Sequence, residues 1–254
     1  MPTSDARLAV LIDADNAQAA RSDALMAEIA TLGRATVKRI YGDWTTDQLR
    51  RWKAAANRHA LQPMQQFAYT TGKNATDSAL IIDAMDLLYT DRLDGFVLVS
   101  SDSDFTRLAT RLRESGMTVY GVGERKTPEA FRTAVDRFIY VDVLALETAD
   151  DDTPSEQTTE DTAPVARASS KQLRGDAGLV KLLRDAVASA SDDEGWANLG
   201  AVGSTVAKRS PDFDSRNWGY AKLVGLVEAI GLFEVRRTSP DGRGGAVEIR
   251  SKKR

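Results

Sequence analysis

Short apolar runs alternate with helical patterns through the first part of the chain. The runs lie at about residues 8–13, 35–41, 61–67, 95–101 and 117–122, and a shorter one follows at 138–141. Each run is bounded by polar residues or glycine and has the length of a buried strand. Between them, apolar residues recur at helical spacing in the stretches 25–32, 49–56, 80–88 and 108–112. This alternation predicts right-handed βαβ crossovers and an α/β fold with a parallel sheet covered on both faces.

Acidic residues follow two of the predicted strands. Asp13 ends the first run, and Asp102 and Asp104 come directly after the fourth. In open parallel sheets, ligands bind beyond the carboxyl ends of the strands, at the point where the strand order reverses. Carboxylates gathered there repel one another unless protons or cations hold them. The positions therefore predict a divalent-metal site.

Asp77 is the fourth acid of this predicted site. It lies at spacings of three, four, seven and eleven from Leu80, Ile81, Ala84 and Leu88, so it shares the buried face of the third predicted helix. Asp83 and Asp86 fall off this face and are expected to be solvated. Each acid also has a structural alternative, because Asp77 suits the first turn of a helix, Asp104 suits an N-cap and Asp13 suits a turn.

Residues beside the acids can assist phosphodiester hydrolysis. Mg²⁺ or Mn²⁺ prefers oxygen ligands, and such an ion binds a phosphate and lowers the pKa of an attacking water. Asn16 can orient a water or a phosphate oxygen, and Ser101 or Ser103 can donate to a phosphate. Lys73 can neutralise a phosphate or orient a carboxylate. The alternatives are turn residues and a solvated lysine.

Composition narrows the chemistry. The chain of 254 residues has no cysteine and one histidine, His59. Disulfides, thiolate zinc sites and cysteine nucleophiles are therefore excluded. Among cysteine, histidine and carboxylate side chains, only the carboxylates are numerous enough to build a site. The sequence contains no apolar stretch of membrane-spanning length, and the first residues lack the apolar core of a signal peptide. We therefore expect a cytoplasmic protein that does not contact a membrane.

A change of composition divides the chain. Residues 147–165 contain seven acidic residues and no lysine or arginine, whereas residues 166–254 contain 16 Lys and Arg against 11 Asp and Glu. A segment so acidic and so poor in large apolar groups cannot offset the entropy of ordering itself. We therefore predict one domain at 1–146, an acidic flexible linker at 147–168 and a second domain at 169–254.

The second domain has a different pattern. Helical patterns at 178–190, 199–209 and 219–230 precede two β-like runs, 233–236 and 246–250, with a glycine-rich hairpin loop at 241–245 between them. Three helices followed by a β-wing describe a small winged-helix α+β domain. Its small size and its excess of Lys and Arg over Asp and Glu are typical of a nucleic-acid-binding domain.

Three motifs of the first domain resemble the NYN domain, a branch of the PIN-like nuclease superfamily. They are Leu11–Asn16, Lys73–Asp83 and Ser100–Phe105, and the resemblance covers residues 7 to about 145. It implies a PIN-like sandwich and a metal-dependent ribonuclease centre. Asp13, Asp77, Asp102 and Asp104 match acidic positions of that family, and Asn16 matches a conserved polar position. Ser101 departs from the glycine of many relatives, but it is also small.

The second domain resembles the LOTUS domain, also called OST-HTH, over about residues 170–250. The matching segments are Trp196–Leu199, Gly203–Tyr220, Lys222–Leu223 and Gly231–Val235. The resemblance implies RNA binding and, in some members, protein partners. Lys208, Arg209, Arg216 and Lys222 are candidate phosphate contacts, with solvated helix faces as the alternative. We expect Trp196, Phe213 and Trp218 to anchor the core. The basic tail, residues 250–254, is either an RNA clamp or a disordered terminus.

The predicted function is a metal-dependent ribonuclease, with endonuclease action, tethered to an RNA-binding winged helix. Two alternatives remain open. One is a non-catalytic RNA-binding or scaffold protein with an inert PIN-like fold. The other is a haloacid-dehalogenase-like phosphatase with Asp13 as nucleophile, although Asn16 and the Asp102–Asp104 pair fit that family poorly. A homo-oligomer is compatible with the PIN-like resemblance, because such sites often need a second protomer to complete the substrate groove.

Overall fold

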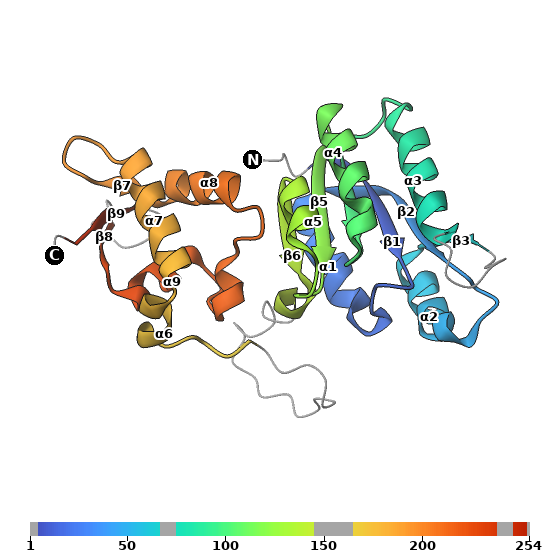
Figure 1. Ribbon diagram of the computed structural model, residues 1–254, viewed down its shortest axis with the longest axis horizontal. Coiled ribbons are helices and arrows are strands. Elements are labelled where there is room, and N and C mark those ends of the chain that lie inside the picture. The colour runs from blue at the N-terminus through green and yellow to red at the C-terminus, as the bar shows by residue number, and fades with distance from the viewer. Residues whose placement is uncertain (1–4, 67–74, 145–164, 238–245, 253–254) are drawn as a thin grey trace. The chain divides into compact units, whose positions relative to one another are not determined.

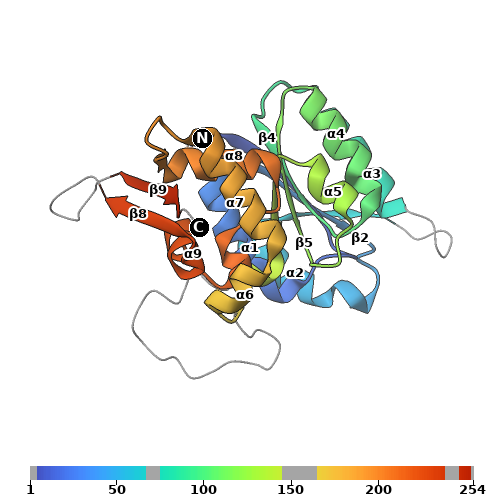
Figure 2. The same ribbon diagram turned by 60° about the vertical axis from the view of Figure 1, so that its left-hand side comes forward.

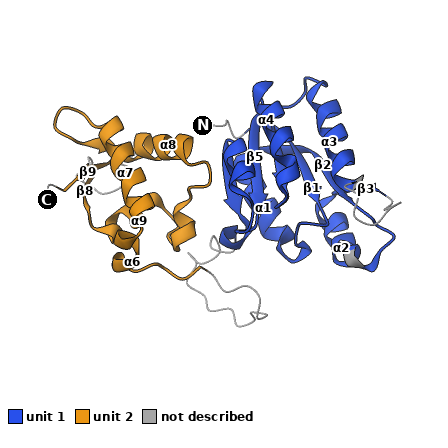
Figure 3. Ribbon diagram, viewed as in Figure 1, with its two compact units in different colours: residues 1–144 blue, residues 145–254 orange. Residues whose placement is uncertain are grey.

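The chain divides into two compact units, Met1–Leu144 and Ala145–Arg254 (Figure 3). The computed structural model describes residues 5–66, 75–144, 165–237 and 246–252. Lys73, the hairpin loop at 241–245 and most of the linker predicted at 147–168 lie outside these ranges. No helix in the described ranges is both long enough and apolar enough to cross a membrane.

The first unit is built on a parallel sheet of six strands (Figure 1). The strands are β1 (Arg7–Asp13), β2 (Arg34–Gly42), β3 (Gln62–Gln65), β4 (Gly95–Val99), β5 (Thr118–Gly123) and β6 (Arg137–Tyr140). Their order across the sheet is β3-β2-β1-β4-β5-β6, and every neighbouring pair is parallel. The order therefore reverses between β1 and β4, which makes the carboxyl ends of these two strands the switch point of the sheet.

Helices connect the strands and cover both faces of the sheet. They are α1 (Ser22–Leu32), α2 (Arg50–His59), α3 (Ala75–Leu88), α4 (Thr106–Glu114) and α5 (Glu129–Ala134). Because the crossovers are right-handed, α1 and α2 lie on one face, and α3, α4 and α5 lie on the other (Figure 2). The predicted α/β fold, with a parallel sheet covered on both faces, is confirmed.

The core of this unit is centred on β1 and β4. Leu8, Val10 and Ile12 of β1 are at most 1% exposed, and all five residues of β4 are buried. A strand covered on both faces needs apolar side chains in both directions, which explains the uninterrupted apolar runs of the sequence. Each fully buried aliphatic side chain stabilises the fold by about 1.5–3 kcal/mol. This packing fixes the carboxyl ends of β1 and β4 rigidly.

Asp83 differs from its predicted state. Its Oδ2 accepts hydrogen bonds from Arg39 Nη1 at 2.9 Å and from Tyr41 Oη at 2.8 Å. The prediction of a solvated side chain used only the spacing along α3, and the polar side chains that β2 presents to this helix could not be known from that spacing. Asp86 is exposed, as predicted.

The second unit is a small α+β domain, as predicted. Its helices are α6 (Ser170–Gly175), α7 (Ala177–Ala190), α8 (Leu199–Arg209) and α9 (Leu223–Ile230). Its antiparallel sheet has the order β7-β9-β8, formed by Ala197–Asn198, Val247–Ser251 and Phe233–Arg237 respectively. The core includes Leu183, Val206, Val227 and Ile249, none of which is exposed.

Two details of this domain differ from the predictions. The last helix begins at Leu223 and not at 219, because Gly219 adopts φ 78° and ends a 3₁₀ helix at Ser215–Trp218. Phe213 and Trp218 pack against the core as predicted. Trp196 instead contacts the guanidinium groups of Arg236 and Arg250, whose Cζ atoms lie over its ring at 4.0 and 4.6 Å from the centroid.

Candidate metal centre

The acidic residues of the first unit lie at the switch point of the sheet. Asp13 is the last residue of β1, and Asp102 and Asp104 follow β4 in the loop and 3₁₀ helix that lead into α4. Asp77 lies in the first turn of α3. Three segments distant in sequence thus bring carboxyl groups to one edge of the sheet.

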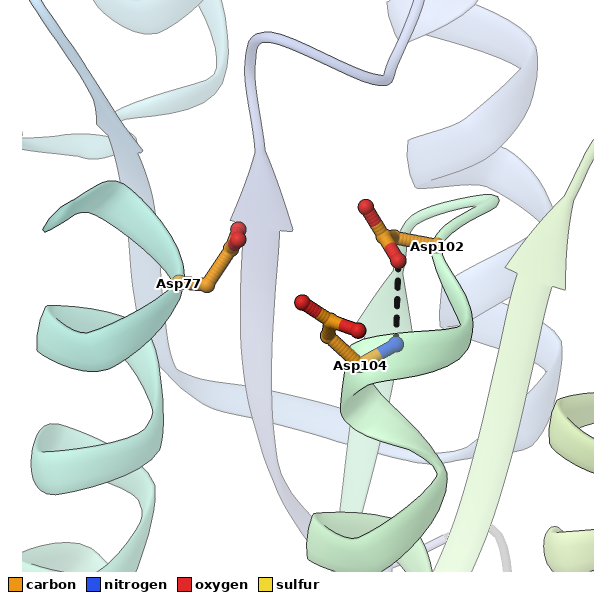
Figure 4. Close-up of side chains that lie close together, drawn as sticks. All are labelled: Asp77, Asp102 and Asp104. Atoms are coloured by element: carbon orange, nitrogen blue, oxygen red, sulfur yellow. Dashed lines mark hydrogen bonds between the residues drawn. The ribbon is translucent and has the colours of Figure 1, made fainter. Parts of the chain in front are cut away.

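Three of these carboxyl groups form a compact group. One oxygen from each of Asp77, Asp102 and Asp104 lies within 4.8 Å of the other two. Figure 4 shows Asp77 on α3 facing the pair that follows β4. Asp77 and Asp102 are half-buried and Asp104 is exposed, so the group is open to solvent on one side. A ligand can therefore reach it.

The loop after β4 holds Asp102 in a defined orientation. Asp102 is the N-cap of the 3₁₀ helix Ser103–Phe105, and its Oδ1 accepts a hydrogen bond from the backbone N–H of Asp104 at 2.9 Å. The structural alternative assigned the capping role to Asp104, whereas Asp102 fills it. Because the cap engages Oδ1, Oδ2 of Asp102 retains its lone pairs for a ligand.

Asp13 does not belong to this compact group of three. Its side chain is completely buried, and it accepts hydrogen bonds from Asn16 Nδ2 and Ser100 Oγ at 2.8 Å and from the backbone N–H of Asp15 at 3.2 Å. Burial raises the pKa of this carboxyl, and the hydrogen bonds from Asn16 and Ser100 oppose the rise. The sequence predicted Asp13 as a fourth metal ligand beside the other three acids. Within the described residues, the carboxylate oxygens that lie within 4.8 Å of one another are those of the other three.

Asp77 carries the clearest electrostatic signal of the site. Burial, followed by the charges of Asp13 and Asp102 and then of other nearby acids, raises the pKa of Asp77 to about 6. A carboxyl group surrounded by negative charge binds a proton more tightly than it does in water. A divalent cation at the same place relieves the same repulsion.

The three carboxyl groups fit a hard divalent cation. Two oxygens bound to one Mg²⁺ lie at most about 4.2 Å apart, since each bond is about 2.1 Å long. Separations within 4.8 Å therefore close with a small adjustment of the side chains. The donor set contains only oxygen, which suits Mg²⁺ or Mn²⁺ and does not suit a softer metal.

The other candidate residues of this site surround the acids. Asn16 is exposed and donates to Asp13. Ser101 is buried, and its Oγ accepts a hydrogen bond from the backbone N–H of Glu124 at 2.9 Å. Ser103 is exposed beside the acidic group. The hydroxyl of Ser103 is therefore the more accessible of the two serine hydroxyl groups.

Two residues of this network were not among the predicted site residues. Ser100 donates to Asp13 Oδ2 and accepts from the backbone N–H of Asp102 at 3.1 Å, so it connects the ends of β1 and β4. Asp15 accepts from Thr76 Oγ1 at 3.2 Å and thereby joins the loop after β1 to α3. Ser100 is adjacent to the predicted Ser101, but strand alternation alone does not indicate which hydroxyl group turns toward Asp13.

The candidate RNA contacts of the second unit separate into two groups. Lys208, Arg209 and Lys222 are exposed, as a phosphate contact requires. The prediction for Arg216 is wrong, because this residue is 5% exposed and its guanidinium group pairs with Asp214 through Nε at 3.1 Å and Nη2 at 2.9 Å. A positive charge in the sequence did not indicate that its partner lies two residues earlier.

Comparison with protein families places two domains on the chain. The family model described as the NYN domain matches residues 7–145, and the model described as the OST-HTH/LOTUS domain matches residues 175–243. The NYN match contains Asp13, Asp77, Asp102 and Asp104. Comparison with curated proteins gave no match.

Several solved structures are similar to parts of the chain. A protein of unknown function from Vibrio parahaemolyticus is 17% identical, with a TM-score of 0.47, covering 55% of this chain and 95% of its own. An uncharacterized protein from Nitrosomonas europaea is 34% identical, with a TM-score of 0.28 and coverages of 41% and 93%. A segment of a Chromobacterium violaceum protein is 37% identical, with a TM-score of 0.26 and coverages of 30% and 82%.

Proposed function

Because this chain belongs to the NYN domain family of PIN-like nucleases and carries an OST-HTH/LOTUS domain, we propose that it is a ribonuclease that requires Mg²⁺ or Mn²⁺. The observation that carries the proposal is the group formed by Asp77, Asp102 and Asp104 at the switch point of the sheet. We propose endonuclease action on RNA, since an acidic group that is open to solvent does not require a chain end.

Each acid has a role that follows from its position. Asp77, Asp102 and Asp104 would hold the divalent ion, which supplies a Lewis acid for the scissile phosphate and lowers the pKa of the attacking water. Asp13 is a positioning residue in this proposal, because its buried carboxyl group fixes Asn16 and Ser100 and adds negative potential at Asp77.

Neighbouring residues would bind and orient the RNA backbone. Ser103 offers an exposed hydroxyl donor beside the acids, and Asn16 retains its amide oxygen for a water or a ribose hydroxyl group. Ser101 has the weaker case because its side chain is buried. Lys73 keeps its proposed role of neutralising a phosphate on the sequence evidence alone.

The C-terminal unit would hold RNA near the catalytic unit. We propose that it is a winged helix and that Lys208, Arg209 and Lys222 bind phosphate groups without regard to sequence. RNA held by one domain reaches the other at a raised effective concentration. The proposed limits of the domains remain 1–146 and 169–254, and a protein partner, a homo-oligomer and a cytoplasmic location remain predictions.

The phosphatase alternative loses its main support. Its nucleophile would be Asp13, whose carboxyl group is fully buried and engaged by three hydrogen-bond donors. A nucleophile must reach its substrate. An assay of RNA cleavage decides between the nuclease and the non-catalytic scaffold.

The test of the proposal is RNA cleavage by the full-length protein. Mixed structured and single-stranded RNAs are incubated with Mn²⁺ or with chelator, and the product ends are mapped. We expect internal cleavage with Mn²⁺ and none with chelator, and a loss of at least about a hundredfold in Asp102→Asn. Asp86→Asn, which removes an exposed acid from α3, is the control and should cleave as the wild type does. RNA binding without metal-dependent cleavage would establish the scaffold alternative instead.

A further inference from the structure

A groove of about 410 Å³ lies between α3 and the ends of β2 and β3. It is lined by Ser78, Ala79, Ile82 and Asp83 of α3, by Tyr41 and Met64 of the sheet, and by Gln66. Ser78 directly follows Asp77 in α3, so the helix that carries one proposed metal ligand also lines the groove. Its volume lies within the usual range for small-molecule sites, roughly 300–1,000 Å³.

The groove combines apolar walls with a few polar groups. Met64 and Ile82 supply aliphatic surface, and Ile82 is 61% exposed, which is unusual for a large aliphatic side chain beside a cavity. Apolar surface left open at a groove is typical of a binding site. A flat heteroaromatic ring is a suitable occupant, since it covers apolar surface with its face and presents polar atoms at its edge.

Asp83 gives the groove its polar character. Its Oδ2 accepts from Arg39 and Tyr41, which fix the carboxyl group, while Oδ1 has no hydrogen bond to any other part of the chain that the structure describes. A carboxylate repels a phosphate but accepts hydrogen bonds from amino and imino groups. The occupant is therefore a neutral ring with donors at its edge and not a phosphate group.

We propose that this groove binds one base of single-stranded RNA next to the phosphate that is cleaved. The proposal rests on the nuclease function above and adds a base-binding site to it. A base reaches the groove only when it is unpaired, so the protein would act on single-stranded regions. Guanine suits Asp83 best, because its adjacent N1–H and amino group can both donate to the open oxygen Oδ1. Uracil, whose edge has two carbonyl oxygens, suits it least.

Photo-crosslinking tests the proposal without requiring catalysis. Single-stranded RNAs that carry one 6-thioguanosine are bound to the full-length protein in an Asp102→Asn background and irradiated. Trypsin releases the groove residues in three peptides, residues 40–50, 59–73 and 74–92, and fragmentation locates the adduct. We expect adducts at Met64, Gln66, Ser78 or Ile82. In Ile82→Ala, the yield at these residues should fall about fivefold, because part of the apolar wall is removed.

Tyr89→Ala is the matched control. Tyr89 is also a large exposed side chain of α3, 71% exposed, and it does not line the groove. Its replacement should leave the adduct yield unchanged. Adducts confined to other surfaces, or equal yields in Ile82→Ala and the wild type, would overturn the proposal. A groove adduct in a protein whose wild type does not cleave RNA would support the base site and refute the nuclease. Cleavage of RNA without a groove adduct would support the nuclease and refute the base site.

Discussion

At the scale of single residues, the acids of the switch point show what spacing can and cannot predict. The positions of Asp13, Asp77 and Asp102 at one edge of the sheet followed from the order of apolar runs. The different surroundings of Asp13 did not, because they depend on hydroxyl and amide donors that turn toward it only in the folded chain. Arg216 and Asp83 show the same limit. The sequence alone does not indicate that either side chain forms an ion pair in the folded protein.

Asp77 gives the metal-free protein a pH-dependent stability. Its folded-state pKa of about 6 lies above the usual value of 3.8, so its favourable contribution is complete below about pH 4 and is lost as the pH rises through about 6. Because the carboxyl group is partly exposed, screening reduces the effect to the order of 1 kcal/mol. With chelator present, Asp77→Asn should therefore raise the stability at pH 7 relative to the wild type, as measured by urea unfolding.

Asp86→Asn is the control for this measurement, because Asp86 lies on the same helix and is exposed. It should leave the difference in unfolding free energy between pH 4 and pH 7 as it is in the wild type. A wild type whose stability increases steadily over this interval, with no change in Asp77→Asn, would contradict the electrostatic account of the site.

Ser100 is predicted to matter more than either serine chosen from the sequence. Ser100→Ala removes a donor to the buried carboxyl group of Asp13 and an acceptor for the backbone N–H of Asp102. We expect a loss of about 1–3 kcal/mol in unfolding free energy and weaker metal-dependent cleavage. Ser103→Ala, at an exposed position, should keep the stability of the wild type. Equal stabilities of the two variants would show that the hydroxyl group does not join the strands.

At the scale of elements, the alternating periodicity was enough to predict the strands and most of the helices. It missed the short helices α5 and α6, because six residues carry too little periodicity to be distinguished from a loop. The sequence predicted right-handed crossovers but not the order of the strands across the sheet. That order is given by which strands pair with one another in the structure.

The end of β5 is packed tightly against the site. A Cβ atom on Gly123 would lie 2.7 Å from the carbonyl oxygen of Ser100 and 2.7 Å from Thr127 Oγ1. Gly123→Ala should therefore displace the end of β4, cost about 1–3 kcal/mol in stability and weaken metal binding. Gly175→Ala is the control, since no atom beyond its chain neighbours and its own helix backbone lies within 4 Å of its Cβ position. Thermal unfolding compares the two, and an unchanged melting temperature in Gly123→Ala would contradict the tight packing.

In the C-terminal domain, substitutions of Arg216 and of Lys222 are expected to affect different properties, stability and RNA affinity respectively. Arg216→Ala leaves the carboxylate of Asp214 without its guanidinium partner and should destabilise the domain by about 3–5 kcal/mol. Lys222→Ala should keep the stability and lower the RNA affinity, with a smaller dependence on salt. Urea unfolding and RNA titrations at two salt concentrations separate the effects. An Arg216→Ala domain of unchanged stability would contradict the structural role.

At the scale of the whole molecule, the covalent connection between the two units should contribute to RNA capture. A protease site inserted between residues 150 and 160, within the acidic segment, allows the connection to be cut after purification. Cutting should raise KM for long RNAs by about ten- to a hundredfold and leave kcat unchanged, because the effective concentration is lost while the catalytic unit is intact. The uncut protein with the same insertion is the control. An unchanged KM would show that the C-terminal unit does not deliver substrate.

The central claim is that Asp77, Asp102 and Asp104 bind one divalent ion together, and calorimetric titration with Mn²⁺ tests it most directly. The wild type and Asp86→Asn should each bind one Mn²⁺ per chain at this site, and Asp77→Asn should bind it at least about tenfold more weakly while remaining folded. If the wild type binds no Mn²⁺, or if folded Asp77→Asn binds it with the affinity of the wild type, the three carboxyl groups are not a metal site.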